Sequence, residues 1–219
     1  MVKAVIFDVD GTLLDTERIY VDAWKEAGRR LGFEIPEEAL KRTRALDRNV
    51  AEKIFQSYIG PSFSYMKTWT LRVEIAEEVI ASGARPLIKP GVPEFLDWLD
   101  KNGIPYAIAS MTASEKTCSH LDRAGLLCRF PVRVTGDEVS HGKPDPEIFL
   151  RAAEKLGVDP ADCAVFEDTY AGIQAAVRAG MLPVMVPDYV PARDEERACA
   201  VILNSMAEAP AAFSDRISR

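Results

Sequence analysis

The chain has 219 residues, 47% of them hydrophobic and 28% charged, a balance typical of a globular protein with one sizeable core, or with a core and a small second domain. Its formal net charge of -7 disfavours binding to nucleic acid or anionic membranes, so an anionic substrate would need a local cation, such as a metal ion, to attract it. The sequence lacks any apolar stretch of membrane-spanning length or room for a signal peptide before Asp8, and we expect a cytoplasmic protein.

The first predicted element is a short strand over residues 3–7. This stretch is a β-branched apolar run, and Gly11 indicates that it ends in a turn, which favours a strand over a buried helical segment. The following residues, 16–82, carry helical spacing instead. We expect about four helices in this segment, separated at Gly32, Pro36, Gly60-Pro61 and Gly83.

Two apolar helical faces are predicted within residues 16–82. One is formed by Tyr20, Trp24, Ala27 and Leu31. The other is formed by Met66, Trp69, Val73, Ala76 and Ile80. The spacing therefore predicts amphipathic helices in this part of the chain.

After Pro90-Gly91 the sequence alternates between helical and strand patterns. The predicted helices cover residues 93–102, 114–124, 145–156 and 171–179. The predicted strands cover residues 106–109, 132–135, 164–166, 183–186 and 200–203. Such alternation is typical of a parallel sheet covered by helices on both faces. We therefore expect an α/β fold with a Rossmann-like, doubly wound parallel sheet.

The helical residues 16–82 interrupt this pattern as an insertion between the first strand and the second. We predict a core domain from residues 1–15 and 83–219, and a helical domain from residues 16–82. The tail from Ala207 to Arg219 is rich in alanine and weakly patterned, so we expect it to fray.

The four cysteines are widely separated in the sequence. No two of them form a C-x-x-C pair, so the sequence predicts neither a zinc site nor a redox motif. We expect reduced and mostly buried thiols at Cys118, Cys128, Cys163 and Cys199.

Polar side chains collect at the predicted carboxyl ends of the strands, where open parallel sheets bind their ligands. Asp8 and Asp10 follow the first strand, Ser110 ends the second, and Glu167-Asp168 ends the strand in "CAVFED". Lys143 lies in the loop "SHGKPDP" before a helix. We expect these side chains to form one site.

The acidic residues have two interpretations. Each acidic pair alone could cap a helix or end a strand at a solvent-exposed surface. Two acidic pairs at one edge of a sheet would instead repel each other unless a cation lay between them. Oxygen ligands of this kind favour Mg²⁺, which takes one or two carboxylates, water and substrate phosphate.

A metal-bound phosphate would make one of these carboxylates a plausible nucleophile, because an aspartyl phosphate divides one difficult transfer into two easier ones. A second carboxylate two residues later could protonate the leaving oxygen and later deprotonate water. Lys143 and the hydroxyl groups of Ser110 and Thr12 are of the right type to position the phosphoryl group and neutralise its charge.

Four motifs resemble those of the haloacid dehalogenase superfamily in order and spacing: "DVDGT", the strand end at Ser110, the Lys143-Pro144 loop and "FEDTYAGIQAA". The segments "DTERIYVDAW" and "KPGVPEFLDWL" further resemble the subgroup with a small helical cap, which contains β-phosphoglucomutase and many sugar-phosphate phosphatases. The resemblance covers nearly the whole chain, and it implies that residues 16–82 form the cap.

The resemblance also implies roles for individual residues. Asp8 would be the nucleophile, and Asp10 the general acid and base that lends its backbone carbonyl to the metal. Ser110 and Lys143 would hold the transferring phosphoryl group. Glu167 would be either a metal ligand or a partner of the ligands. The metal ligands implied are Asp8, Asp10, Glu167 and Asp168.

The predicted substrate-binding residues are Thr12, Thr16, Tyr20, Trp24, Arg48 and Thr112. Arg48 aligns with the cap arginine that meets the non-transferring phosphate in β-phosphoglucomutase, whereas its basic neighbours are expected to face solvent. The side chains of Tyr20 and Trp24 either face the substrate-binding cleft or pack within the cap. His141, next to the lysine loop, is expected in a surface loop without a role.

These features predict a Mg²⁺-dependent phosphatase acting on a small phosphorylated metabolite. The alternative is a phosphomutase that returns the phosphate to a sugar, but relatives with that activity carry a histidine where this chain has Tyr20 and a lysine where it has Ala113. A third alternative is a protein that binds a sugar phosphate without catalysis. We expect a monomer with no nucleic-acid or membrane partner.

Overall fold

The computed structural model describes residues 1–43 and 48–216. They form two compact units, Met1–Asp15 together with Ile88–Arg219, called here the core unit, and Thr16–Leu87, called the helical unit. The second boundary follows Leu87 rather than Ser82. Residues 83–87 remain with the helices because Arg85 pairs with Asp22 at 2.7 Å and Leu87 packs against the apolar cluster of the helical unit.

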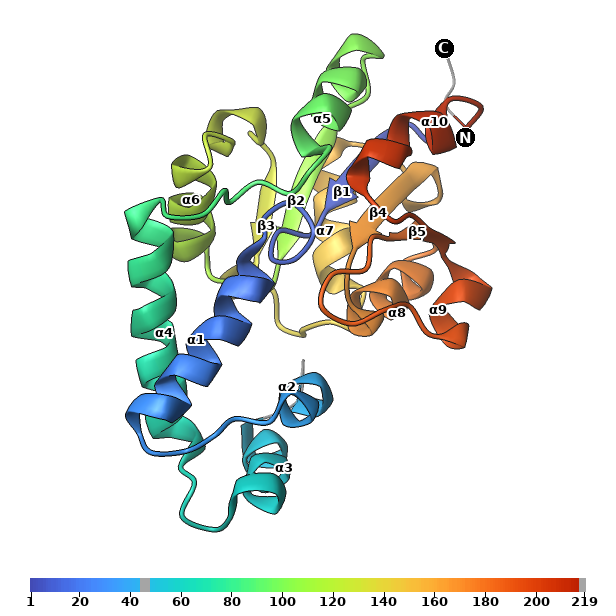
Figure 1. Ribbon diagram of the computed structural model, residues 1–219. Coiled ribbons are helices and arrows are strands. Elements are labelled where there is room, and N and C mark those ends of the chain that lie inside the picture. The colour runs from blue at the N-terminus through green and yellow to red at the C-terminus, as the bar shows by residue number, and fades with distance from the viewer. Residues whose placement is uncertain (44–47, 217–219) are drawn as a thin grey trace. The chain divides into compact units, whose positions relative to one another are not determined.

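The core unit is built on a six-stranded sheet with the order β3-β2-β1-β4-β5-β6, and every pairing in it is parallel (Figure 1). This confirms the predicted α/β fold class. The strands are β1 (Ala4–Phe7), β2 (Tyr106–Ser110), β3 (Arg133–Thr135), β4 (Cys163–Glu167), β5 (Leu182–Met185) and β6 (Val201–Ile202).

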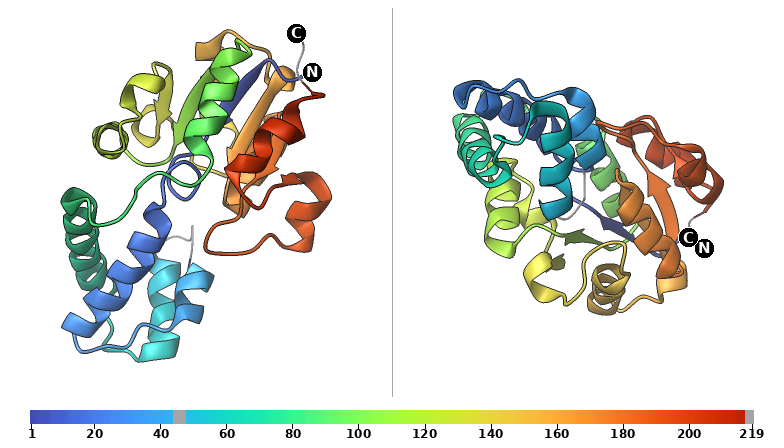
Figure 2. Two further views of the ribbon diagram at one scale, coloured as in Figure 1. Left: turned by 45° about the horizontal axis from the view of Figure 1, so that its top comes forward. Right: turned by 90° about the horizontal axis from the view of Figure 1, so that it is seen from below.

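Helices cover both faces of this sheet (Figure 2). The helices of the core unit are α5 (Val92–Lys101), α6 (Ser114–Arg123), α7 (Glu147–Leu156), α8 (Tyr170–Arg178), α9 (Asp194–Cys199) and α10 (Ala209–Phe213). Short 3-10 turns lie at Leu127–Arg129, Gly136–Glu138, Pro160–Asp162 and Met206–Glu208. The helices α9 and α10 were not predicted, because a segment of five or six residues is too short to reveal a helical period.

Alternation along the strands decides which face each side chain joins. Ile6 of β1 packs with Phe149 and Ala152 of α7 in one apolar cluster. Phe7 points to the other face, where its ring centroid lies 5.8 Å from that of Phe95 in α5 and 5.3 Å from that of Phe166 in β4. Because β1 is packed on both of its faces, its carboxyl end is held rigidly.

The helical unit contains α1 (Thr16–Arg30), α2 (Glu37–Thr43), α3 (Arg48–Ile59) and α4 (Tyr65–Ser82). Helices α1 and α4 lie side by side, and their buried residues form one apolar cluster (Figure 1). From the predicted face of α4, Ala76 and Ile80 join this cluster together with Ile75, whereas Met66 is exposed. Leu31 is also exposed, because α1 ends before it.

The expectation that the tail from Ala207 to Arg219 frays is wrong for its described residues, 207–216. Phe213 of α10 is completely buried, with its ring centroid 5.4 Å from that of Phe166. The backbone of Arg216 accepts a 2.8 Å hydrogen bond from Val2. Packing against the sheet thus orders a segment whose own pattern is weak.

The expectation of mostly buried thiols is also wrong. All four cysteines are free thiols, and of the four only Cys163, in β4, is buried. Cys128 and Cys199 are exposed because they lie in a surface 3-10 turn and in the short helix α9. None of the helices in the described part of the chain has both the length and the apolar character needed to cross a membrane.

Candidate active site

The carboxyl ends of β1 and β4 bring two of the predicted acidic residues together. Phe7 pairs with Phe166, and the Asp8 N–H extends this ladder by donating a 2.9 Å hydrogen bond to the Phe166 carbonyl. This register places Asp8 beside Glu167, with Asp168 one residue further. The sequence predicted that the acidic residues gather at this edge of the sheet. The parallel pairing of β1 and β4 explains why the two acidic segments meet there.

Lys143 lies between the two carboxylates. Its ammonium nitrogen is 2.6 Å from Asp8 Oδ1 and 2.6 Å from Glu167 Oε1, and it donates a third hydrogen bond of 3.1 Å to the Ala109 carbonyl. The side chains of Lys143, Asp8 and Glu167 are only 7%, 11% and 1% exposed. A buried cation thus bridges the ends of β1, β2 and β4.

Burial and charge act against each other on the two titratable partners of this bridge. Burial raises the pKa of Asp8 to about 8; Lys143 opposes this shift and Glu167 adds to it. Burial lowers the pKa of Lys143, but the carboxylates of Asp8 and Glu167 outweigh it and raise that pKa above its ordinary value. The lysine therefore stays positively charged, and a further cation near Asp8 would favour its carboxylate form.

A tight turn after β1 carries Asp10. The Val9 carbonyl accepts hydrogen bonds from the N–H groups of Leu13 and Leu14 at 3.0 and 2.9 Å, and Gly11 adopts a φ of 86°, which favours glycine. The Asp10 carboxylate is oriented by Thr112, whose hydroxyl donates a 2.8 Å hydrogen bond to Asp10 Oδ2. Thr112, predicted to bind substrate, therefore contacts an acidic residue of the site.

Ser110 is buried at the end of β2 and lies one residue after the carbonyl that Lys143 contacts. Its hydroxyl oxygen accepts a 3.1 Å hydrogen bond from the Thr112 N–H, which fixes the side chain against the loop after β2. The ends of β1, β2 and β4 thus assemble three of the four predicted motifs, and the loop before α7 adds the fourth through Lys143.

Residues 2–180 match the family of haloacid dehalogenase-like hydrolases. The chain belongs to this family. The prediction from its four sequence motifs is therefore confirmed, and so is the predicted class of enzyme, a phosphoric monoester hydrolase.

Three relatives show how far the similarity extends. The "Phosphorylated carbohydrates phosphatase" of Thermotoga maritima is 34% identical over 181 residues, 82% of each chain. The "Beta-phosphoglucomutase" of Bacillus subtilis is 31% identical over 189 residues, 84% of this chain and 83% of that protein. The crystal structure of a β-phosphoglucomutase from Clostridium difficile has a TM-score of 0.76 at 25% identity, covering 99% of this chain and 96% of that one.

Within this haloacid dehalogenase-like site, Glu167 is held in part by Thr169, a residue that the sequence analysis did not single out. Its Oε2 accepts hydrogen bonds from the N–H of Asp168 at 3.0 Å, and from the N–H and hydroxyl of Thr169 at 2.9 and 2.8 Å. A side chain at position 172 would collide with this carboxylate, since a Cβ there would lie 1.9 Å from it. The glycine in "EDTYAG" was the available signal, because it leaves space for a neighbouring group.

The donor atoms of this site suit a hard divalent cation. Asp8 and Asp168 follow adjacent strands, and the backbone carbonyl of Asp10 is a further oxygen donor in the turn after β1. Mg²⁺ favours oxygen ligands and usually takes only one or two carboxylates, with water or substrate completing its shell. In their ionised forms, the buried acids Asp8, Glu167 and Asp168 would carry more negative charge than one lysine balances, so both charge and donor type fit the metal.

A second group of ligand-type side chains lies in the loop before α7. Single ligand atoms of His141, Asp145 and Glu147 lie within 4.8 Å of one another. His141 is exposed, however, and Glu147 is already engaged: its Oε2 accepts the His141 N–H at 2.9 Å and its Oε1 pairs with Arg151 at 2.6 Å. This group ties the loop onto α7, and we assign no metal to it.

Two predicted substrate contacts, Tyr20 and Trp24, are buried within the helical unit. The Arg72 guanidinium carbon lies 3.9 Å from the centroid of the Tyr20 ring, and the Trp24 ring stacks on Phe55 with 5.1 Å between centroids. Packing of these side chains, one of the two alternatives from the sequence, is therefore observed. Their contact with substrate stays a prediction.

Thr16 and Arg48 lie in different settings of the same unit. Thr16 is buried at the start of α1, whereas Arg48 is exposed at the start of α3, with its guanidinium carbon 4.7 Å from the centroid of the Trp69 ring. Part of the predicted basic segment, residues 44–47, lies outside the described residues. Binding of substrate by Thr16 or Arg48 stays a prediction.

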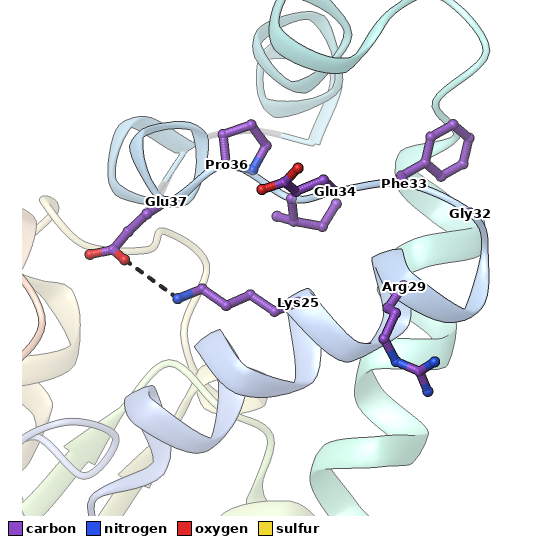
Figure 3. Close-up of a pocket in the computed structure, with 8 residues that line it drawn as sticks. Lys25, Arg29, Gly32, Phe33, Glu34, Pro36 and Glu37 are labelled. Carbon is purple, nitrogen blue, oxygen red and sulfur yellow. Dashed lines mark hydrogen bonds and ion pairs between the residues drawn. The ribbon is translucent and has the colours of Figure 1, made fainter.

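A hollow of about 590 Å³ lies on the helical unit between the end of α1 and the start of α2. Figure 3 shows Lys25 extending toward Glu37, and the ammonium lies 3.4 Å from Glu37 Oε2. Arg29 also lines the hollow but pairs with Glu26 at 2.7 Å. Since both of these cations are already balanced by carboxylates, we assign the hollow no part in phosphate binding.

Thr12, predicted to bind substrate, is completely buried. Its hydroxyl has no hydrogen-bond partner among the described residues. A buried hydroxyl without a partner costs about 1–3 kcal/mol of stability. The setting therefore does not favour direct contact between this hydroxyl and substrate.

Replacing Thr12 by valine tests this assignment. We expect the free energy of unfolding to stay the same or rise by about 1 kcal/mol, because a methyl group replaces the unpaired hydroxyl in the same volume. Activity should stay close to that of the wild type, with urea unfolding and phosphate release as the measurements. A fall in kcat/KM in Thr12→Val but not in Thr12→Ser would show instead that the hydroxyl contacts substrate.

Proposed function

We propose that this chain is a Mg²⁺-dependent phosphatase that hydrolyses a small phosphorylated carbohydrate, or a similar metabolite, through an aspartyl phosphate on Asp8. The observation that carries the proposal is the buried ammonium group of Lys143, which lies 2.6 Å from the carboxylate of Asp8 at the end of β1. The names of two relatives, a phosphorylated carbohydrates phosphatase and a fructose-1-phosphate phosphatase, support this substrate class.

The first half of the proposed reaction forms the phosphoenzyme. The Asp8 carboxylate attacks phosphorus, and the bond from phosphorus to the leaving oxygen breaks as Asp10 transfers its proton to that oxygen. Lys143 and Ser110 hold the phosphoryl oxygens and neutralise their charge. Thr112 keeps the Asp10 carboxylate in place through its 2.8 Å hydrogen bond.

The second half of the reaction restores the enzyme. Asp10, now a carboxylate, takes a proton from a water molecule as that water attacks phosphorus, and the acyl phosphate bond to Asp8 breaks. Phosphate leaves, and both carboxylates return to their starting states. The same residue thus acts first as the acid and then as the base.

Asp8, Asp168 and the backbone carbonyl of Asp10 are the proposed ligands of Mg²⁺. When bound, the ion would neutralise charge on the phosphoryl group and on the nucleophile. For Glu167, the contacts favour the alternative in which it is a partner of the ligands. Both of its oxygens already accept hydrogen bonds, Oε1 from Lys143 and Oε2 from the start of α8.

The phosphomutase alternative retains support, because one relative is named β-phosphoglucomutase. Two positions favour hydrolysis. Tyr20 stands where the mutase relatives carry a cap histidine. A tyrosine has an ordinary pKa of about 10, so it stays neutral near pH 7 and cannot replace a cationic imidazole. Ala113, directly before α6, stands where they carry a lysine.

The decisive measurement is the product ratio with β-glucose 1-phosphate. We expect released phosphate to exceed glucose 6-phosphate by a wide margin, and addition of glucose 1,6-bisphosphate should not reverse this ratio. Removal of divalent cations with EDTA should abolish phosphate release, and Mg²⁺ should restore it. Conversion to glucose 6-phosphate with little free phosphate would support the mutase instead.

A panel of phosphorylated sugars and nucleotides would then identify the substrate, with free phosphate and isomerised product measured in parallel. Absence of turnover on the whole panel, together with Mg²⁺ binding, would favour the third alternative, a protein that binds without catalysis. The role of the helical unit as a cap, a monomeric state and a cytoplasmic location stay predictions.

A further inference from the structure

A buried ion pair joins the turn after β1 to the loop after β5. Lys89 is the second residue of the core unit after the chain returns from the helical unit. Its ammonium nitrogen lies 2.8 Å from Asp188 Oδ1 and donates a 2.7 Å hydrogen bond to the Gly11 carbonyl. The Asp188 side chain is 1% exposed and that of Lys89 is 13% exposed. Three segments far apart in the sequence thus meet at this lysine.

Lys89 contacts the turn through its backbone as well as its side chain. Its N–H donates a 3.0 Å hydrogen bond to the Leu13 carbonyl, next to the antiparallel bridge between Leu14 and Ile88. The carbonyl that accepts from its ammonium belongs to Gly11, the residue directly after Asp10. The turn that presents Asp10 is therefore anchored on one side by Lys89, while Thr112 holds the carboxylate on the other.

The stability of the fold alone does not explain why this pair is buried. Removing an ammonium and a carboxylate from water carries a large desolvation penalty, and well-packed apolar side chains often stabilise such a position as well or better. The ammonium also makes a contact that no apolar side chain could replace, the hydrogen bond to the Gly11 carbonyl.

The geometry points to Lys89 as a positioning residue for Asp10, with Asp188 holding the ammonium in place. This inference rests on the proposed function, in which Asp10 transfers the proton. Proton transfer requires hydrogen-bond distance between the acid and the leaving oxygen. A displacement of about 1 Å can lower the rate by about 100-fold, so loss of this anchor should affect turnover more than substrate binding.

Three variants separate positioning from stability: Lys89→Met, Asp188→Asn and the double variant. Lys89→Met keeps the apolar stem but leaves Asp188 buried without its cation, so it should lower both stability and kcat. In the double variant the buried charge is gone, and stability should recover toward that of the wild type. The hydrogen bond to Gly11 is still missing there, so kcat should stay roughly 10- to 100-fold below the wild type, with KM little changed.

Hydrogen exchange of the turn provides a measurement that does not depend on activity. The Gly11 N–H donates to the Leu14 carbonyl at 2.8 Å, and the Leu14 N–H donates to Val9 at 2.9 Å. We expect both amides to exchange at least about tenfold faster in the double variant than in the wild type. The matched control is Lys3→Met with Asp162→Asn, a more exposed pair whose charged atoms lie 2.6 Å apart at the starts of β1 and β4, and it should leave kcat and the turn unchanged.

The outcomes distinguish this inference from the proposed function. Activity is measured as p-nitrophenyl phosphate hydrolysis with Mg²⁺. Wild-type kcat and wild-type exchange in the double variant would overturn the positioning role and reduce the pair to a structural one. If the wild type itself failed to hydrolyse any phosphate ester, the proposed function would fall, while the exchange rates would still show whether Lys89 orders the turn.

Discussion

Replacing Asp8 by asparagine is expected to lower turnover by about four orders of magnitude or more. The amide has nearly the same size as the carboxylate, but its oxygen is a poor nucleophile toward phosphorus. The fold should persist, because burial already disfavours a charge at this position and Lys143 keeps its contact with Glu167. Phosphate release and the urea unfolding midpoint are the two measurements.

The matched control for this substitution is Asp162→Asn. Asp162 also pairs with a lysine at 2.6 Å, but it lies on a more exposed surface, directly before β4. The control should retain full activity. Wild-type turnover in Asp8→Asn would mean that another group attacks the phosphate ester, and it would remove the aspartyl phosphate from the mechanism.

Replacing Lys143 by methionine is expected to damage both stability and activity. The substitution leaves Asp8 and Glu167 buried without the ammonium that lies 2.6 Å from each of them. Breaking a buried ion pair in this way typically costs about 3–5 kcal/mol. Loss of a cation at the phosphoryl group should also lower kcat by roughly 100-fold or more.

Mg²⁺ should offset part of this loss, because a cation that binds only the folded protein stabilises it by mass action. We expect the thermal midpoint of Lys143→Met to rise more on addition of Mg²⁺ than that of the wild type, as measured by scanning calorimetry. Lys3→Met, which removes an exposed lysine, should show no such difference. Equal Mg²⁺ shifts in both variants would argue against a metal next to Asp8.

Much of the fold follows from local patterns in the sequence. The apolar runs that end at Phe7, Ser110 and Glu167 are short and continuous, as expected of strands covered on both faces, and the helices between them show clear amphipathic spacing. Because the carboxyl ends of parallel strands share one edge, the order of the elements was enough to predict which acidic residues would meet.

Local patterns failed where contacts distant in sequence decide the structure. Residues 209–213 are too short and too rich in alanine to predict a helix, yet Phe213 fills a place beside Phe166 in the aromatic core. In α4 the apolar residues extend around the helix, and packing against α1 decides that Ile75, Ala76 and Ile80 are buried while Met66 is exposed.

The sequence by itself determined which residues are candidates for the site, because residue type, and position at a strand end or in a loop beside it, limit which groups can act there. Asp8, Asp10, Ser110, Lys143 and the 167–168 pair were all identified in this way. Only the tertiary structure decided their partners. That Lys143 bridges Asp8 and Glu167, and that Lys89 joins Gly11 to Asp188, depends on loops 24 to 135 residues apart in the chain. No local period encodes such distances, since burial and charge pairing act only once the sheet has brought the loops together.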